Sequence, residues 1–221
     1  MPNRTLRFHV ALALALSALA CGGKAPAASP APVDRPPTEP VKPFATVVFA
    51  GEPIAVLPFT LVLPVDTLGK VPPLNDRPTM LAWGDSLLGE QLNARGPEVK
   101  WILPPELRKV ARRAPSVAPD PDRMGQSILR AKQLENLPDP LRGQLRNLVA
   151  LLGGRYALVP AALTFLSEPT GAVRAELSLV LADTRTGKVV WRTLAWAHGA
   201  TPAEALTLAL TAVFPAALDI R

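Results

Sequence analysis

Few side chains in this sequence could take part in covalent chemistry, and their number limits the reactions to consider. Cys21 is the only cysteine, and His9 and His198 are the only histidines. A single thiol cannot form a disulfide within one chain or supply a metal site made of several cysteines. Because a serine hydroxyl is a weak nucleophile without a base, a serine such as Ser86 would need a partner such as His198.

The residues around Cys21 form the pattern of an export signal. Arg4 and Arg7 precede an apolar stretch, which ends in the small residues of 17–20. This order is typical of a signal peptide, and the stretch is shorter than the roughly 20 residues that cross a bilayer. The pattern resembles the lipobox of bacterial lipoproteins. That resemblance implies cleavage before Cys21 and acylation of its sulfur and amino group.

Two other interpretations of this segment are weaker. A buried amino-terminal helix would be separated from any core by the proline-rich stretch that follows. An ordinary secretory signal cut near Ala20 would leave Cys21 without a role. With a lipidated Cys21, several acyl chains would give a stable anchor, and Gly22 after the cysteine favours the outer membrane by resemblance to Gram-negative lipoproteins.

Composition divides the chain into three parts. We expect a signal peptide over 1–20, the lipidated cysteine and a Pro/Ala-rich tether over 21–43, and a single periplasmic α/β domain over 44–221. Hydrophobic residues make up 48% of the 221 residues, enough for one core. The formal charge of +6 falls to +4 once Arg4 and Arg7 are removed. That charge, without an aromatic-rich basic motif, argues against nucleic acid as a partner, and we expect no metal and no cofactor.

One tetrapeptide has the form of a catalytic motif. Gly84-Asp85-Ser86-Leu87 matches the signature of the SGNH (GDSL) esterases, in which the serine is the nucleophile and a late Asp-x-x-His supplies the base. Here Ala195, not an aspartate, stands three residues before His198, and the flanking spacing is helical. The alternative is a helix with Asp85 and Ser86 on its polar side and Leu87 and Leu88 buried. We therefore predict that Asp85, Ser86 and His198 do not lie within hydrogen-bond reach of one another.

Basic and aromatic residues offer two further candidate contacts. A cluster of positive charge between 108 and 113 could bind a protein partner or an anionic cell-wall polymer, or could be a solvated helix face. Its members are Arg108, Lys109, Arg112 and Arg113. Tryptophans are frequent in binding hot spots, although burial is the simpler expectation for most of Trp83, Trp101, Trp191 and Trp196.

Apolar spacing predicts the elements that must position these groups. Strands are expected at 54–59, with an irregular extension at 61–63, and at 99–103, 156–166, 173–183 and 189–196. Helices are expected at 78–95, from 104, from 122 through 134, from 141 to 153, and from 202. The alternation along 173–183 and the turn residues Asp183 to Gly187 indicate a tight hairpin. The fold class is therefore α/β (α+β): a single mixed sheet of about four to five strands flanked by helices, with a carboxy-terminal hairpin followed by a helix.

Three segments resemble a known family in the same order along the chain. They are Ile54-Ala55-Val56-Leu57-Pro58-Phe59, the run 151–160 with its Leu-Gly-x-x-Tyr entry to a strand, and the Asp-Thr-x-Thr-Gly-x-x-x-Trp hairpin of 183–191. They are similar to envelope lipoproteins related to CsgG and to TolB amino-terminal-like domains. The resemblance implies a mixed sheet flanked by helices and a mostly non-enzymatic family of secretion pores, synthase activators and assembly factors. No segment resembles the pore-forming strands of CsgG.

The sequence thus predicts a membrane-anchored periplasmic lipoprotein that is not an enzyme. It would act through contacts with an envelope protein in assembly or secretion, and a homo-oligomer stays open. The alternatives are a GDSL-type serine esterase acting through Ser86 and a binder of anionic cell-wall polymer.

Overall fold

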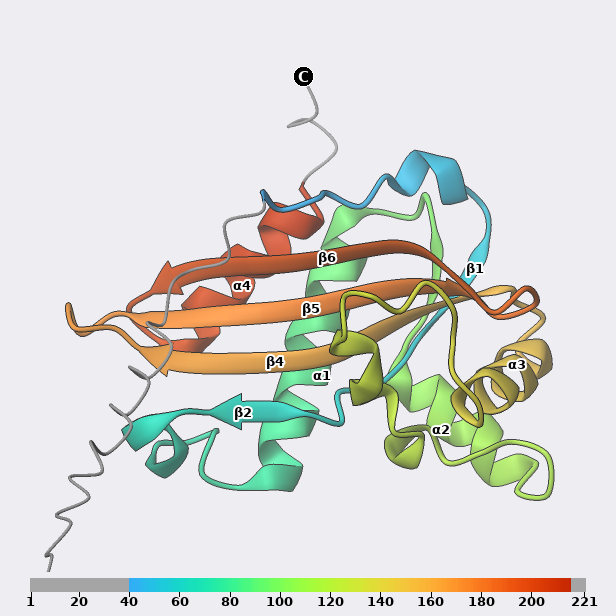
Figure 1. Ribbon diagram of the computed structural model, residues 1–221, viewed down its shortest axis with the longest axis horizontal. Coiled ribbons are helices and arrows are strands. Elements are labelled where there is room, and N and C mark those ends of the chain that lie inside the picture. The colour runs from blue at the N-terminus through green and yellow to red at the C-terminus, as the bar shows by residue number, and fades with distance from the viewer. Residues whose placement is uncertain (1–39, 216–221) are drawn as a thin grey trace, which may run out of the picture. The chain divides into compact units, whose positions relative to one another are not determined.

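The computed structural model describes residues 40–215, which form one mixed six-stranded sheet with helices packed against it (Figure 1). The strand order is β3-β1-β4-β5-β6, and β2 pairs with β4 as well. The strands are β1 (Pro53–Val56), β2 (Val62–Pro64), β3 (Lys100–Ile102), β4 (Tyr156–Ser167), β5 (Val173–Asp183) and β6 (Lys188–Gly199). The α-helices in this part of the chain are α1 (Arg77–Arg95), α2 (Pro104–Arg113), α3 (Leu141–Leu151) and α4 (Pro202–Val213). The α/β fold class is confirmed.

The sheet has a parallel part and an antiparallel part. β1 runs parallel to β3 and to the start of β4, whereas β4, β5 and β6 form an antiparallel meander. The sheet has one strand more than expected because the segment after β1 pairs separately, as β2, with the far half of β4. Pro58 follows β1, and Pro160 lies in β4 next to a register shift. Since proline has no N–H for a ladder, the two prolines separate the pairings of β1 and β2.

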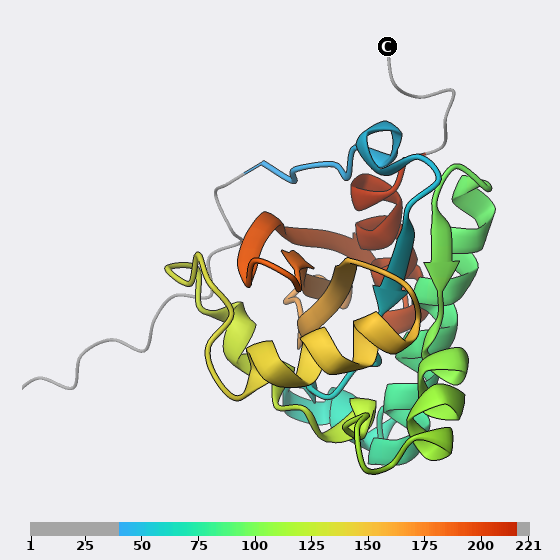
Figure 2. The same cartoon turned by 90° about the vertical axis from the view of Figure 1, so that its right-hand side faces the viewer.

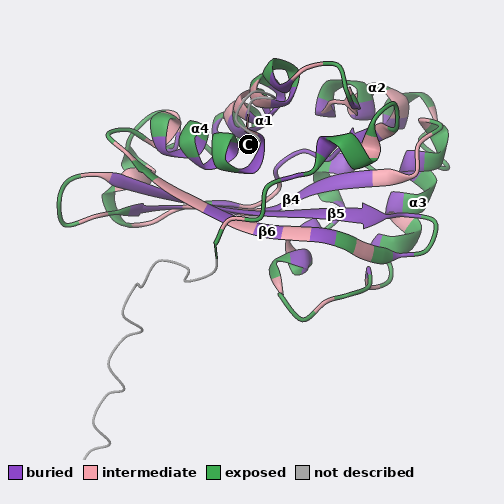
Figure 3. Cartoon of the chain, turned by 90° about the horizontal axis from the view of Figure 1, so that it is seen from above, coloured by how far each residue is buried: buried purple, intermediate pink, exposed green. Residues whose placement is uncertain are grey.

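Each face of the sheet has its own apolar core. On one face, buried side chains of the strands pack with α1 and α4, including Leu88, Leu92 and Leu206. On the other face, α2, α3 and the segment between them cover Ala157, Val180 and neighbouring positions. Figures 2 and 3 show these layers from two further directions. The central strands are buried on both sides, which explains the nearly continuous apolar run at the start of β4.

The helix predictions at 78–95, from 104, from 141 and from 202 are confirmed, with ends set by local capping. Asp76 caps α1 by accepting the Thr79 N–H at 3.0 Å. At α4, Thr201 accepts the Glu204 N–H at 3.2 Å, and the Glu204 carboxylate accepts the Ala200 N–H at 2.7 Å. This reciprocal arrangement satisfies backbone donors that a helix start leaves without partners. None of the helices within residues 40–215 combines the length and apolar character that crossing a bilayer requires.

The predicted helix from 122 through 134 is wrong. Two short 3₁₀ helices stand there, η3 (Pro121–Arg123) and η4 (Gln126–Arg130). Gly125 separates them with a φ of +68°, a conformation that suits glycine. Beyond η4 the chain stays irregular because Arg192 of β6 binds the carbonyls that a helix would need. Its guanidinium donates to the backbone oxygens of Leu129, Ala131 and Leu134 at 2.6, 2.8 and 2.9 Å.

The hairpin predicted at Asp183 is confirmed, and Asp183 organises its turn. The Asp183 carboxylate accepts the backbone N–H groups of Arg185 and Thr186 at 3.0 and 3.2 Å. Its other oxygen binds the guanidinium of Arg155 at 2.6 Å. Burial alone would raise the pKa of Asp183, but these hydrogen bonds, led by that from Arg155, outweigh it and lower the pKa to about 2.

We predict that Asp183→Asn destabilises the fold by about 1–2 kcal/mol at pH 7. The carboxylate has a pKa of about 2 in the fold and an ordinary value of 3.8. Solvent around the Arg155 side chain, which is 42% exposed, weakens the ion pair. A lowered pKa means that the stabilisation is complete above about pH 4 and is lost as the pH falls toward 2. Urea unfolding should show the full difference at pH 7 and little of it at about pH 2 or below. The control is Glu135→Gln, which removes one acid as well but from an exposed position, and it should change neither value.

Candidate functional site

The candidate site begins at Asp85, which the fold buries in the middle of α1. Asp85 is 8% exposed, and its carboxylate accepts the backbone N–H of Phe59 at 2.7 Å. Gly84 makes this approach possible: a Cβ there would come within 3.1 Å of the Phe59 ring. The GDSL tetrapeptide therefore joins α1 to the chain that leaves β1. The expectation that Asp85 lies on the solvent-exposed polar side of the helix is wrong. Asp85 is buried and faces the backbone of Phe59.

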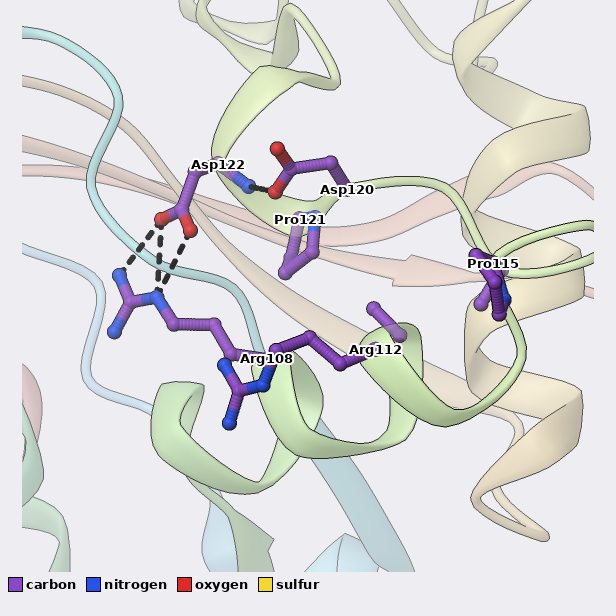
Figure 4. A pocket seen from close by; sticks show the side chains of 8 residues that line it. Arg108, Arg112, Pro115, Asp120, Pro121 and Asp122 are labelled. Atoms are coloured by element: carbon purple, nitrogen blue, oxygen red, sulfur yellow. Dashed lines mark hydrogen bonds and ion pairs between the residues drawn. The ribbon is translucent and has the colours of Figure 1, made fainter.

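Arg108 of α2 binds Asp85 and a second carboxylate. Its Nη2 donates to Asp85 at 2.7 Å. Its Nε and Nη2 also form a forked pair with Asp122 of η3, with distances of 2.7–3.1 Å (Figure 4). One guanidinium thus holds together α1, α2 and η3. The hydrogen bond that Arg108 donates to Asp122, followed by the one that it donates to Asp85, raises the pKa of Arg108. Burial raises the pKa of Asp85, although the bonds from Phe59 and Arg108 oppose that shift.

A hollow lies on either side of Arg108. One, of about 430 Å³, is lined by Arg108, Arg112, Pro115, Asp120 and Asp122 among others (Figure 4). The other, of about 400 Å³, is lined by Asp85, Ser86, Glu90, Asn93 and Arg108 among others. The carboxylates next to Arg108 offset its charge in both hollows. Within residues 40–215, no group of three or more potential metal-binding side chains comes together.

The groups that an esterase would need lie on separate elements. Ser86 is exposed on α1, whereas His198 lies near the end of β6, where its Nδ1 is 4.0 Å from Glu168 and its ring contacts Trp196. Among the described residues, no hydrogen bond joins Asp85, Ser86 and His198. The prediction that these three do not meet is confirmed, as are a helical setting for Ser86 and a buried Leu88. Leu87 is half-buried.

The four basic residues of α2 do not form one solvated surface. Arg108 is 29% exposed and paired with two carboxylates, and Lys109 lies 3.5 Å from Glu106. Arg112 and Arg113 are exposed at the end of the helix. Contact of Arg108, Lys109, Arg112 and Arg113 with a partner or a polymer stays a prediction, and Arg112 and Arg113 are its best candidates. The expected burial of the tryptophans is confirmed for Trp191. Trp83 and Trp101 are partly buried against the same core.

Sequence reasoning did not find a second feature, an incompletely covered part of the sheet. On the face that carries α2 and α3, no described helix lies over the end of β4, β5 and β6 that is remote from these helices (Figure 3). The strand register places rows of side chains there. The rows are Leu166–Arg174–His198, Thr164–Glu176–Trp196 and Ala162–Ser178–Leu194. We call these nine residues the bare sheet face. The alternation of 173–183 indicated one exposed side, but only the tertiary structure shows which part the helices cover.

Arg174 lies on the central strand of the bare sheet face, in its outermost row. Its side chain is 2% exposed and binds Glu168 at 2.9 Å and Glu176 at 3.1 Å. A buried guanidinium needs such partners because an uncompensated buried charge is costly. Leu166 lies opposite Arg174 on β4 and Trp196 lies diagonally across on β6, so apolar atoms stand beside a charged centre.

Comparison with known proteins gives a fold likeness and no family. No family model matches the chain, and no curated protein matches it. Similar solved structures include the LpoB C-terminal domain from Salmonella enterica, with 12% identity, a TM-score of 0.38, and coverage of 66% of this chain and 82% of that one. A PelC dodecamer from Paraburkholderia phytofirmans has 14% identity, a TM-score of 0.38, and coverage of 80% and 96%.

Lipoprotein GNA1162 from Neisseria meningitidis has 14% identity, a TM-score of 0.37, and coverage of 67% and 83%. The last of these neighbours is a lipoprotein, as its name states. Identities and TM-scores this low do not transfer a function, so the resemblance to CsgG and TolB amino-terminal-like domains stays a prediction.

We predict that the Asp85–Arg108 pair is energetically coupled, with an interaction of more than about 1 kcal/mol in a double-mutant cycle. The variants are Asp85→Ala, Arg108→Ala and the double change, measured by urea unfolding. Removing Arg108 leaves the buried Asp85 without a counterion, whereas removing Asp85 leaves Arg108 with Asp122 alone.

The exposed pair Glu106–Lys109 on the same helix is the matched control. Its coupling should stay below about 0.5 kcal/mol, as for other surface pairs. Equal coupling in the two cycles would show that the Asp85–Arg108 pair does not hold the elements together.

Proposed function

We propose that this chain is a lipid-anchored lipoprotein on the periplasmic side of the outer membrane. It acts without catalysis, through contact of the bare sheet face with a protein of the cell envelope. The observation that carries this proposal is the bare sheet face itself, since the other half of the same face is covered by α2, α3 and η4. The proposed family is that of CsgG-like and TolB amino-terminal-like domains.

The chemistry of the bare sheet face suits a protein partner. Leu194 and Trp196 of β6 are half-buried, and His198 beside them is 42% exposed at its side chain. Tryptophan combines a large apolar area with an N–H donor and is enriched at interface hot spots. Arg174, Glu168 and Glu176 add fixed charges next to this apolar patch. Apolar anchors surrounded by polar groups are the usual composition of a protein interface.

The position of the face agrees with a tethered domain. The first described residues lie beside β6: the Lys42 N–H donates to Thr193 Oγ1 at 3.0 Å, and the Phe44 N–H donates to Val213 O at 2.8 Å. The 17 residues between Gly22 and Pro40 allow these two residues to lie at most about 65 Å apart when the chain is fully extended. A tether of that length would let the face reach a partner some distance from the membrane.

The esterase alternative gains no support from the described residues. Asp85 is occupied by Phe59 and Arg108, and the base candidate His198 belongs to the bare sheet face. A serine nucleophile requires its base within hydrogen-bond reach.

The anchor is tested at Cys21. We expect labelled palmitate to be incorporated into the wild-type chain in its own cells and lost in Cys21→Ser, because the thiol is the acylation site that the lipobox implies. The matched control is Ser17→Ala, which alters a neighbouring residue and keeps the thiol. Incorporation that survived Cys21→Ser would refute the anchor and leave the contact proposal to its own test.

The contact is tested by site-specific crosslinking. A photo-crosslinking residue at His198 should give a discrete adduct with an envelope protein, whereas the same residue at Leu208 should not. Leu208 is 46% exposed on α4, which packs on the opposite side of the sheet.

A second change shows whether the adduct depends on the face. Adding Trp196→Ala should reduce the His198 adduct by about tenfold or more, as expected for a hot-spot tryptophan, with circular dichroism confirming that the fold is kept. Adducts of equal yield from positions 198 and 208, or no effect of Trp196→Ala, would overturn the proposal.

A further inference from the structure

A basic hollow lies where the segment after η4 crosses β5 and β6. It has a volume of about 270 Å³ and is lined by Arg130, Lys132, Ser178, Arg192, Thr193 and Leu194. We call it the basic hollow. Three of these six residues are cationic and none is acidic. It is separate from the Asp85–Arg108–Asp122 cluster, in which carboxylates offset the guanidinium.

Arg192 gives the basic hollow a positive charge that no carboxylate compensates. Its three hydrogen bonds go to backbone carbonyls of 129, 131 and 134, and no acid within residues 40–215 forms an ion pair with it. An arginine has five N–H donors, so two remain after these three bonds. Burial lowers the pKa of Arg192, as expected for a charge that is partly desolvated without a counterion.

The carbonyls also fix the guanidinium in place. The three carbonyls belong to a segment without regular helix, so their bonds to Arg192 fix both the guanidinium and the loop that carries Arg130 and Lys132. The charge of the hollow is therefore preorganised, which lowers the cost of binding an anion.

Neighbouring groups complete the wall. Ser178 projects from β5 on the same face, and its hydroxyl forms no hydrogen bond with any described residue. Thr193 alternates with Arg192 and Leu194 along β6, so its hydroxyl, which accepts the Lys42 N–H, lies on the opposite face of the sheet. The nearest acid along β5, Glu176, is bound by Arg174. The volume suits a small group, since pockets for drug-sized molecules begin at about 300 Å³.

We propose that the basic hollow is a binding site for a phosphate group, carried either by a lipid headgroup or by a soluble phosphate ester. Arg130 and Lys132 reach the group from the rim, Arg192 supplies charge from the floor, and the Ser178 hydroxyl donates to a phosphate oxygen. Charge-assisted bonds of this kind are stronger than neutral ones. The hollow shares Ser178 and Leu194 with the bare sheet face, but its three cations lie outside that face. Neutralising Arg130 and Lys132 therefore tests the phosphate site separately from the partner contact.

The test compares two variants that lose the same charge. Arg130→Gln/Lys132→Gln removes two cations from the hollow, and Arg112→Gln/Arg113→Gln removes two exposed cations from α2. Both are made in the full chain with Cys21→Ser, so that no acyl chain contributes to binding. Arg192 is left intact because its loss would release the segment after η4.

Calorimetric titration with inorganic phosphate at low salt should show binding to the parent chain. It should be at least about tenfold weaker in Arg130→Gln/Lys132→Gln and within twofold of the parent in Arg112→Gln/Arg113→Gln. Added sodium chloride should weaken it, since the site is open to solvent. Absence of phosphate binding by the parent, or an equal loss in both variants, would overturn the proposal.

Vesicles distinguish the two sources of the phosphate. Co-flotation with phosphatidylglycerol vesicles but not with phosphatidylcholine vesicles, lost in Arg130→Gln/Lys132→Gln alone, would identify a lipid headgroup. Phosphate binding without co-flotation would support the site and assign it to a soluble ester.

Discussion

The ion pair between Asp85 and Arg108 is the interaction on which the arrangement of the second helical layer depends. Asp85 lies inside α1 and also binds the backbone after β1, whereas Arg108 belongs to α2 and also binds η3. Both partners are largely withdrawn from water, so each needs the other. The consequence is a fixed position for the proline-rich middle of the chain, which has few regular backbone hydrogen bonds of its own.

Arg192 has the corresponding role on the other side of that middle segment. It binds three carbonyls of 129–134, and Gln126 donates to the Pro58 carbonyl at 2.6 Å. The side chains of Arg192 and Gln126 thus make hydrogen bonds to the backbone in place of those that a regular helix would have provided. Buried polar backbone groups must find partners, and here those partners come from residues more than 50 positions away. A segment held in this way can carry charge at a defined place, as in the basic hollow.

The helices cover only half of one face of the sheet, so this face has a buried half and a half that no described helix covers. Where α2, α3 and η4 pack, both faces of β4 and β5 are apolar and buried. Beyond that cover, the same strands carry Arg174, Glu176 and Ser178 on one face and keep Leu177 and Leu179 on the other. The change of pattern along a single strand follows from the length of the layer above it. A face of mixed apolar and charged residues has the composition that protein interfaces usually show.

The sequence alone determined most of the local structure and the pattern around Cys21. The alternation in 173–183, the turn at Asp183 and the cap at Thr201 all act over a few residues, so their signals are present in the adjacent sequence. The separation of β1 and β2 was only partly predictable, because Pro58 shows where pairing stops but not where it resumes.

Tertiary structure decided what these elements do together. A helical pattern could not show that Asp85 faces the Phe59 backbone, or that Arg108 pairs with Asp122 and does not face solvent. The helix predicted at 122–134 does not form because Arg192, from a strand distant in the sequence, binds backbone carbonyls of this segment. The residues of the segment itself give no sign of that contact. The same limit applies to the bare sheet face: alternation shows that one side of β5 is polar, while the extent of the helices packed on it sets which part stays available.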